Sequence, residues 1–382
     1  MNVPATSPDI RDHIDRLRGM FAVAILLGHT IDLTYGQGVP DYWFQVLMPI
    51  RPLVGFEWVV GFIVLSGYCV TRSCQLDARM SFSGYLALRA SRLFPLLWTC
   101  LLLAAALEGW MSASGYRPPV WSGHMDAGSF ATNALGLGGF FGTFGSLAPA
   151  YTLSYELLYY VLWGTTWFAT GRRHGAALIY ASLASAAGCA LNGVVPHLPT
   201  GQLRFAFMLF SCWALGAALA QWLPFLAHTR VARVLAPFRW VFVLAVIGSG
   251  FSLASMPLFE TSLASALYYI LLAGAFAFVS VGFAARMGEV RVSGLDRWLG
   301  VLSYPLFLAH GPVIMALATF YRALGITLPF GTYVLALGAP AIVVAWLLAM
   351  AVEQPVMALR RRMRVRAAPG GAPMPVAGVP IN

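Results

Sequence analysis

Apolar residues follow one another along this chain in long stretches, without the apolar–polar alternation that marks the strands of a membrane barrel. A helix crosses the hydrocarbon core of a bilayer with about 20 mostly apolar residues, and it satisfies its own backbone hydrogen bonds there. Ten stretches have this character: 19–38, 52–71, 90–109, 147–168, 176–194, 203–222, 238–256, 262–284, 299–320 and 332–352. The pattern predicts an all-α polytopic membrane protein, a bundle of about ten transmembrane helices.

The composition supports this fold class and sets the domain organisation. Of the 382 residues, 59% are hydrophobic and 10% are charged, and the mean hydropathy is +0.74. These values exclude an ordinary soluble domain. We expect residues 1–358 to form one transmembrane domain and residues 359–382, which are basic and then rich in Pro, Gly and Ala, to form a disordered cytoplasmic tail. Any chemistry is therefore expected inside the bundle.

The positive charges predict the orientation. All 24 basic residues are arginine, so a lysine-based mechanism is excluded. With the N-terminus in the cytoplasm, 20 arginines fall on the inner side, and only Arg51, Arg117, Arg204 and Arg322 fall outside. This asymmetry predicts an even number of spans with both termini cytoplasmic. The net charge of +10 then indicates contact with anionic lipid rather than with nucleic acid. The five cysteines lack metal-ligand spacing, so no metal site is predicted.

The first predicted span carries Arg18 and, eleven positions later, His29. Eleven helical steps make roughly three turns, so both side chains lie on one face, with their Cα atoms about 16 Å apart along the axis. An ionisable residue inside a span is a candidate functional residue, because burying it there is unfavourable. Asp32 lies on the same face and is expected to orient the His29 ring. The alternative is a histidine that only bonds a neighbouring helix.

Two further segments carry polar residues toward the inner side of the membrane. Arg89 and Arg92 are three residues apart on one helix face, so both guanidinium groups can contact one anion. Arginine suits phosphate because its planar fork binds two oxygens at once. Ser66 and Tyr68 lie in the segment GFIVLSGY, near the inner half of the second span. The alternative for each arginine alone is an ordinary interfacial charge.

Three later segments also stand out. The fourth span begins with YTLSYELLYY, and its Glu156 either binds substrate hydroxyls or stabilises the helix N-terminus without a further function. The ninth span contains LGVLSYPLFLAHGPV, and the tenth ends in AVEQP, where Glu353 is expected to pair with nearby arginines. The glycine-rich loop 110–146 is either a sugar-binding lip or an interfacial re-entrant hairpin.

Six of these segments, in this order, resemble the acyltransferase-3 family of integral-membrane acyltransferases, over residues 14 to 356. The matching elements are Arg-x10-His (Arg18, His29), LSG[YF] (Ser66 to Tyr68), RxxRxxP (Arg89, Arg92, Pro95), [WY]SLSxE (Thr152 to Glu156), LGxxSYxxYLxH (Leu299, Gly300, Ser303, Tyr304, Leu308, His310) and ExP (Glu353, Pro355). In the family pattern an acidic residue often stands six positions before the serine of LSG. This chain has Val60 at that position, and Glu57 is the nearest carboxylate.

The resemblance implies a bacterial inner-membrane enzyme that transfers an acyl group, usually acetyl, from cytoplasmic acyl-CoA to a hydroxyl of an extracytoplasmic carbohydrate. It implies that Arg18, Arg89, Arg92, Ser66 and Tyr68 bind the donor. The catalytic residues expected are His29, as general base or acyl carrier, Asp32 and Glu156. The residues expected to bind the acceptor are Tyr151, Ser154, Ser303, Tyr304 and His310.

Two alternatives to this function remain open at this point. The same chemistry can act on a small-molecule secondary metabolite, or the chain can be a glycan transporter without enzymatic activity. The residues do not distinguish direct transfer from an acyl-enzyme relay, and they leave the oligomeric state open.

Overall fold

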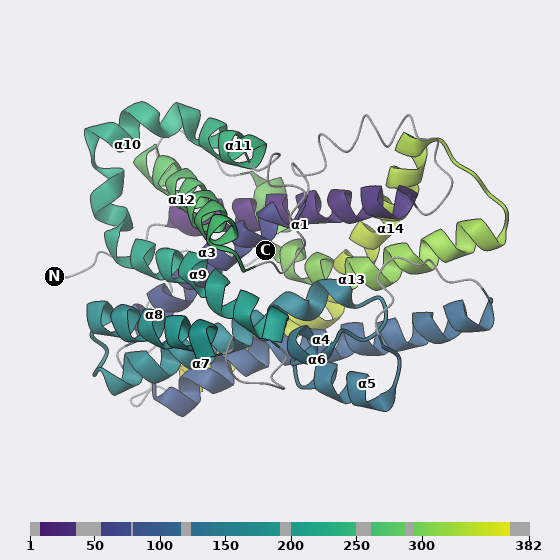
Figure 1. The fold of residues 1–382 in the computed structure, drawn as a ribbon, viewed down its shortest axis with the longest axis horizontal. Coiled ribbons are helices and arrows are strands. Elements are labelled where there is room, and N and C mark those ends of the chain that lie inside the picture. The colour runs from purple at the N-terminus through teal and green to yellow at the C-terminus, as the bar shows by residue number, and fades with distance from the viewer. Residues whose placement is uncertain are drawn as a thin grey trace.

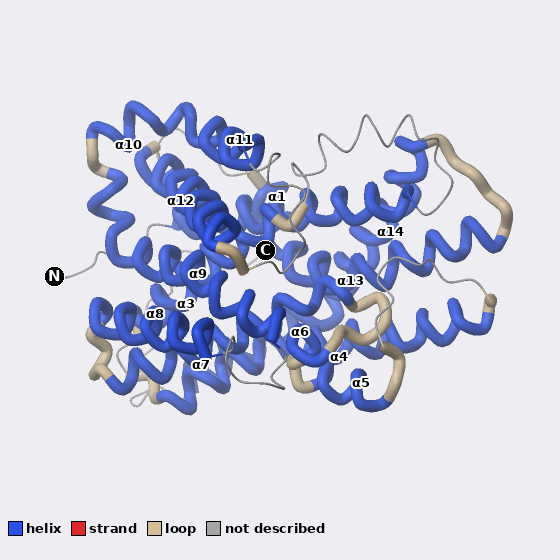
Figure 2. The backbone as a smooth tube through the Cα atoms, viewed as in Figure 1, coloured by secondary structure: helices blue, strands red, loops and turns tan. Residues whose placement is uncertain are grey.

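The computed structural model describes residues 8–35, 55–77, 79–115, 124–191, 200–249, 261–286 and 293–366. In these residues the chain forms helices and no strand (Figure 2). The elements are α1 (Pro8–Tyr35), α3 (Glu57–Leu76), α4 (Phe82–Ala113), α5 (Ala127–Ala134), α6 (Gly138–Phe141), η2 (Ala148–Ala150), α7 (Tyr151–Ala169), α8 (His174–Leu191), α9 (Thr200–Ala227), α10 (Arg230–Leu235), η3 (Ala236–Phe238), α11 (Arg239–Ser249), α12 (Leu263–Ala285), α13 (Gly294–Ala323), α14 (Phe330–Leu348), η5 (Ala349–Glu353) and α15 (Gln354–Arg366).

The all-α membrane fold expected from the sequence is confirmed. Each of the ten predicted stretches coincides with a helix, and eight helical segments of the described chain are long and apolar enough to cross a membrane. The two helices outside this group are α1 and α7. They carry Arg18, His29 and Glu156, so the polar residues that make them candidates for function also lower their hydropathy.

Helices α1 and α13 form the most extensive helix pair of the bundle and run parallel. At one end Arg16 makes two bonds to Asp296, of 2.8 and 2.6 Å, and further along His29 meets His310. The partners are 280 and 281 residues apart, so the register stays constant over more than three turns. Parallel packing is what ten alternating spans require of the first and the ninth.

Helix α12 runs antiparallel to α1. The ring of His13 stacks on Phe283 at 5.0 Å, whereas Phe21, two turns later, meets Phe276 at 5.1 Å. An antiparallel pair agrees with the alternation expected of the first and eighth spans. Helix α10 and the connection between α13 and α14 lie at opposite ends of the long axis of the bundle (Figure 1). Helices α1, α4 and α13 extend along this axis.

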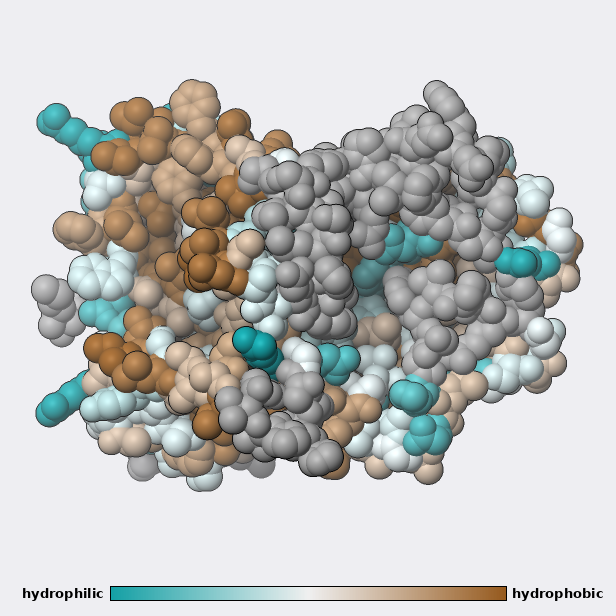
Figure 3. Space-filling model, viewed as in Figure 1, coloured by the Kyte–Doolittle hydropathy of each residue, from teal (hydrophilic) through white to brown (hydrophobic). Residues whose placement is uncertain are grey.

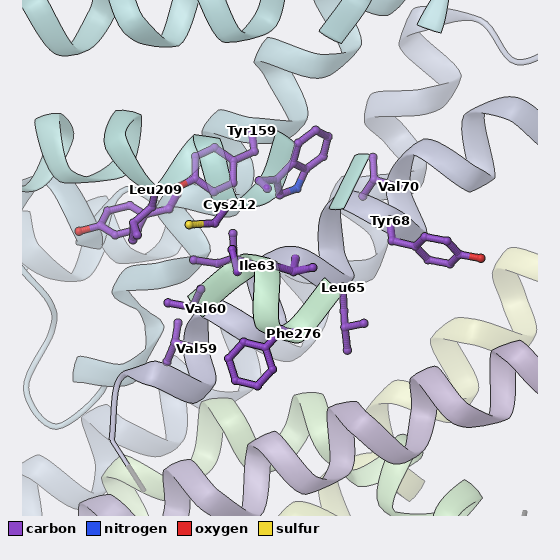
Figure 4. Packing of buried hydrophobic residues seen from close by; sticks show 14 of the residues in the cluster. Val59, Val60, Ile63, Leu65, Tyr68, Val70, Tyr159, Leu209, Cys212 and Phe276 are labelled. Carbon is purple, nitrogen blue, oxygen red and sulfur yellow. The ribbon is translucent and has the colours of Figure 1, made fainter. Parts of the chain in front are cut away.

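Helix α3 lies in the middle of the core. Its residues Val60 and Val64 are fully buried, and the cluster around them includes Tyr159 of α7, Leu209 of α9 and Phe276 of α12 (Figure 4). Surface residues of α10 to α12 are instead large and apolar, such as Val234, Val241 and Leu271 (Figure 3). An exposed apolar belt of this kind is the lipid-facing surface expected of a membrane bundle.

Glycines allow α3 to approach α9. A Cβ atom added at Gly67 would lie 2.0 Å from the carbonyl oxygen of Trp213, and one at Gly216 would lie 1.9 Å from that of Val64. Small residues at a helix crossing let two backbones come close, which is how helices gain packing contacts inside a membrane. The glycine of the LSGY segment therefore serves the fold, while its neighbours Ser66 and Tyr68 face the cavities described below.

We expect Gly67→Leu to prevent this crossing and to abolish the yield of monodisperse protein, because the added side chain would overlap backbone atoms rather than a movable side chain. Size-exclusion chromatography of a fluorescent fusion in detergent measures this. The matched control is Gly109→Leu on α4, where an added Cβ meets no atom within 4 Å. Equal, wild-type yields for both variants would contradict the packing role of Gly67.

One boundary differs from the expectation. The helix that follows Glu353 continues through Arg366, so the basic run that we assigned to a disordered tail is helical as far as that residue. The reason is local, because Met, Ala, Leu and Arg are all good helix formers and no Gly or Pro interrupts them before residue 369. The remainder of the expected tail, residues 367–382, lies outside the described residues.

Candidate active site

A large cavity with a basic lining lies where α1, α3, α4 and α15 meet, and we call it the basic cavity. Its space, counted out to its open mouth, is about 1890 Å³, and its lining includes five arginines together with Asp15, Tyr68 and Glu353. The arginines are Arg18, Arg72, Arg89, Arg92 and Arg360. Positive charges gathered around an open space favour a ligand that carries several negative charges.

A second, mostly apolar cavity, the inner cavity, lies next to the first, and its space, counted out to its openings, is about 790 Å³. Arg18, Cys69 and Arg92 line both cavities, so the two spaces adjoin at these side chains. Along α3 the inner cavity reaches from Val70 to Val59, a distance of about 16 Å for eleven helical steps. A basic cavity and an apolar one are therefore neighbours inside the bundle, with these shared side chains between them.

Arg92 is the guanidinium group best placed at the junction. Among the described residues it makes no hydrogen bond and no ion pair, whereas Arg18 is 3.6 Å from Asp15. Arg89 is buried, donates to Ser73 and lies over the ring of Tyr85 at 5.2 Å. Arg92 interacts electrostatically with Glu156 and Glu353 but is bonded to neither. A guanidinium inside a protein is costly to leave without hydrogen bonds, so an anionic group is expected to occupy the space that it faces.

Glu156 forms the polar centre of the inner cavity. Its Oε1 accepts a hydrogen bond of 2.7 Å from Ser66 Oγ and one of 2.9 Å from the hydroxyl of Tyr160. No side chain or backbone group of the described residues donates to its Oε2, which leaves that oxygen for a ligand in the cavity. Glu156 is the sixth residue of α7, so it does not lie in the first turn and the capping alternative is excluded.

His29 and His310 form a pair on α1 and α13. Nδ1 of His29 lies 2.6 Å from Nε2 of His310, and the rings stack with centroids 4.9 Å apart. On its other side, Nδ1 of His310 lies 2.8 Å from the carbonyl oxygen of Leu306. A carbonyl only accepts, so Nδ1 of His310 carries a proton, and in a neutral pair Nε2 of His310 then accepts from Nδ1 of His29. This arrangement leaves Nε2 of His29 with its lone pair, the form that a general base needs.

The structure changes two expectations about His29. The partner of its ring is His310, which we expected to bind the acceptor, so the orienting role of Asp32 stays a prediction. His29 also lines neither of the two cavities. The cavities that adjoin the arginines therefore end before the imidazole. Phe307 lies in between, because it lines the inner cavity and its ring lies 6.4 Å from the ring of His310.

The residues expected to bind the acceptor fall into two groups. Ser154 and Ser303 are buried outside both cavities, where Ser154 Oγ accepts from the Gly139 amide and Ser303 Oγ donates to the Gly300 carbonyl. Their positions therefore support a role in packing and not the substrate role that we expected. Tyr304 lines the inner cavity but donates its hydroxyl proton to the Leu93 carbonyl.

Tyr151 contacts Phe56 and Tyr155 at the start of α7, outside both cavities. The described part of the glycine-rich loop includes the end of α4 and forms α5 and α6, and its last residue, Ser146, donates its amide to Glu108 at 2.5 Å. This arrangement tests neither of the two alternatives for the loop, a sugar-binding lip or an interfacial re-entrant hairpin. Glu57 lies beside Tyr268 and outside both cavities.

Glu353 does not form the ion pair that we expected. Among the described residues its Oε2 is buried without a hydrogen-bond partner, and the side chain lines the basic cavity instead. It ends the π-helical segment η5, an irregularity that often marks a functional position. The extra residue in that turn shifts the side chain relative to the face that a regular helix would present.

Sequence reasoning missed four residues of the site: Arg72, Tyr160, Phe307 and Arg360. Arg72 and Tyr160 follow Tyr68 and Glu156 by four positions, so helical spacing alone was a sufficient signal for both. Arg360 was counted only as a topological charge, yet it reaches the Leu88 carbonyl of α4 at 2.7 Å. Phe307 carried no signal, because an aromatic residue in a span is ordinary.

Comparison with known proteins agrees with the resemblance. Residues 11–350, nearly the whole chain, match the acyltransferase domain that defines the acyltransferase-3 family. No curated protein matches the chain, and no solved structure does. Residues 11–350 match the family, a helix of the described residues overlaps each of the ten expected spans, and eight helical segments are long and apolar enough to cross a membrane, so the chain belongs to the acyltransferase-3 family and is a multi-pass membrane acyltransferase.

Proposed function

We propose that this protein is an O-acyltransferase of a bacterial inner membrane, which moves an acyl group, acetyl first of all, from cytoplasmic acyl-CoA to a hydroxyl of an extracytoplasmic carbohydrate. The observation that supports it best is the adjacency of the two cavities, which share Arg18, Cys69 and Arg92 in their linings. Five arginines line the entrance, and an apolar slot with a carboxylate follows. Acyl-CoA has the same order of parts, with phosphates at one end and a thioester on an uncharged arm at the other.

The arginines would hold the donor by its phosphates. Arg92 and Arg18 at the junction are placed to hold the phosphate group nearest the arm, while Arg72, Arg89 and Arg360 surround the wider space. Guanidinium–phosphate pairs are charge-assisted and bidentate, so they fix orientation as well as affinity. The arm would then extend past Cys69 toward Ser66 and Glu156.

The transfer step follows from the histidine pair. Nε2 of His29 takes the proton of the acceptor hydroxyl, the hydroxyl oxygen attacks the thioester carbonyl, and the carbon–sulfur bond breaks to release the CoA thiolate. His310 holds the ring in the required tautomer through the 2.6 Å bond to Nδ1. Glu156, with Oε2 facing the cavity, accepts hydrogen bonds from the donor arm or from the acceptor.

A sidedness experiment tests this function. Inverted and right-side-out membrane vesicles are prepared from cells that naturally carry the protein and from a deletion strain, and both receive acetyl-CoA labelled in the acetyl group. We expect label in the polymeric carbohydrate fraction only with inverted vesicles and only when the protein is present, because the basic end faces the cytoplasm and CoA cannot cross the bilayer.

Three other outcomes would overturn parts of the proposal. Label in a low-mass, solvent-extractable product would identify a small-molecule acceptor in place of a glycan. Equal labelling from both vesicle orientations would contradict the assigned orientation. Export of the glycan that depends on the protein, without any transfer of label, would favour a transporter.

A further inference from the structure

Two phenylalanines of the inner cavity pack against each other, and one of them lies next to the histidine pair. Phe62 of α3 and Phe307 of α13 both line the inner cavity, and their ring centroids lie 5.7 Å apart. The same Phe307 ring lies 6.4 Å from the ring of His310. One side chain therefore contacts the donor cavity on one side and the proposed base pair on the other.

The order of residues along α13 gives the same result. Tyr304, Phe307 and His310 are three residues apart, so they follow one another on one face of the helix. Tyr304 lines the inner cavity, Phe307 lines it as well, and His310 is fully buried beyond it. A step of three residues is about 4.5 Å, so the width of one aromatic ring separates the cavity from the imidazole.

We propose that Phe307, braced by Phe62, keeps the thioester apart from His29 until an acceptor hydroxyl is in place, and thereby determines whether the acyl group goes to the acceptor or to water. This inference rests on the proposed function and adds to it a specificity-determining residue. Phe62 is itself held by Phe21 of α1, at 5.7 Å, so the wall is anchored to the helix that carries His29.

The chemical need for such a wall is direct. A base that deprotonates an acceptor hydroxyl also deprotonates water. Water would lose a proton to Nε2 of His29, its oxygen would attack the thioester carbonyl, and the carbon–sulfur bond would break to give a free carboxylic acid and CoA. Excluding water from reactive intermediates is a recognised function of closed active sites. A phenylalanine can do this and still open, because a change of χ1 moves its ring between separate wells.

The experiment measures acceptor-free hydrolysis of labelled acetyl-CoA by the purified full-length protein in detergent, as released acetate. We expect Phe307→Ala to raise this rate several-fold, Phe307→Leu to raise it less, and Phe62→Ala to raise it as well. The rise should vanish in the double variant Phe307→Ala/His29→Ala, because the hydrolysis needs the base on the far side of the wall. A merely loosened fold would not depend on His29.

The matched control is Phe278→Ala. Phe278 is also half-buried and in an aromatic pair, with Phe242 at 5.2 Å, but it lines neither cavity. Wild-type hydrolysis in all three wall variants would overturn the proposal, and so would a rise that persists without His29. Should Phe307→Ala fail to elute as folded protein, Phe307→Leu and Phe62→Ala decide the matter. Failure of the wild type to bind acetyl-CoA at all would instead overturn the donor assignment, and this inference with it.

Discussion

Replacing His310 by leucine is expected to reduce acyl transfer about 100-fold, the order of loss that follows removal of a working general base. Leucine fills much of the same space but offers no acceptor, so Nδ1 of His29 can no longer donate a hydrogen bond to residue 310. The imidazole can then place its proton on either nitrogen, and only one tautomer leaves Nε2 unprotonated. The measurement is the rate of label transfer in inverted vesicles at saturating acetyl-CoA, with KM determined separately.

Three further variants make this prediction specific. His29→Ala should be at least as inactive, and the double variant should be no worse than His29→Ala, because His310 acts through His29. His310→Gln should retain part of the activity, since its amide oxygen can accept from Nδ1. His228→Ala, at an exposed position near the end of α9, is the control and should leave transfer unchanged. Full activity in His310→Leu with an inactive His29→Ala would remove His310 from the mechanism.

The sequence predicted that Arg18 and His29 share one helical face of α1, but it did not identify His310 as a partner of His29. Helical geometry is enough to put Arg18 and His29 on one face, and both do face α13 or the cavities beside it. The choice of Asp32 as the partner of His29 came from its nearness in sequence. His310 is 281 residues away, and only the parallel packing of α1 against α13 brings the two rings together. No local sequence pattern indicates which residue of α13 lies opposite His29.

Three of the five arginines of the basic cavity, Arg18, Arg89 and Arg92, stood out in the sequence through their spacing and their place in the family pattern. What the sequence could not supply is the shape between helices. Ser154 and Ser303 looked like substrate ligands, yet their hydroxyls bond to neighbouring backbone groups in the packed bundle. Phe307 looked like any apolar residue and proved to form a wall of the inner cavity. Polarity identifies residues with a possible chemical role, and tertiary packing decides which of them face open space.

The arginines can be tested one by one through the affinity for acetyl-CoA. We expect Arg92→Gln to raise KM about 10- to 100-fold, which corresponds to the loss of one hydrogen bond between charged groups, about 1.5–3 kcal/mol. Arg92 is the most informative position, because it has no hydrogen bond or ion pair to lose among the described residues, so the fold should tolerate the change. Arg72→Gln and Arg360→Gln should act in the same direction.

The effects of the variants on kcat and on KM should distinguish residues of the basic cavity from residues of the inner cavity. Variants of the basic cavity should raise KM for acetyl-CoA and leave kcat nearly unchanged, since they remove interactions made equally in the ground and transition states. Arg18 and Arg92 also line the inner cavity, so variants of these two residues should lower kcat as well. Arg230→Gln, exposed at the start of α10 and outside both cavities, is the control for a general loss of positive charge. If Arg230→Gln raised KM as much as Arg92→Gln, the effect would come from the overall surface potential, and the basic cavity would not be the donor site.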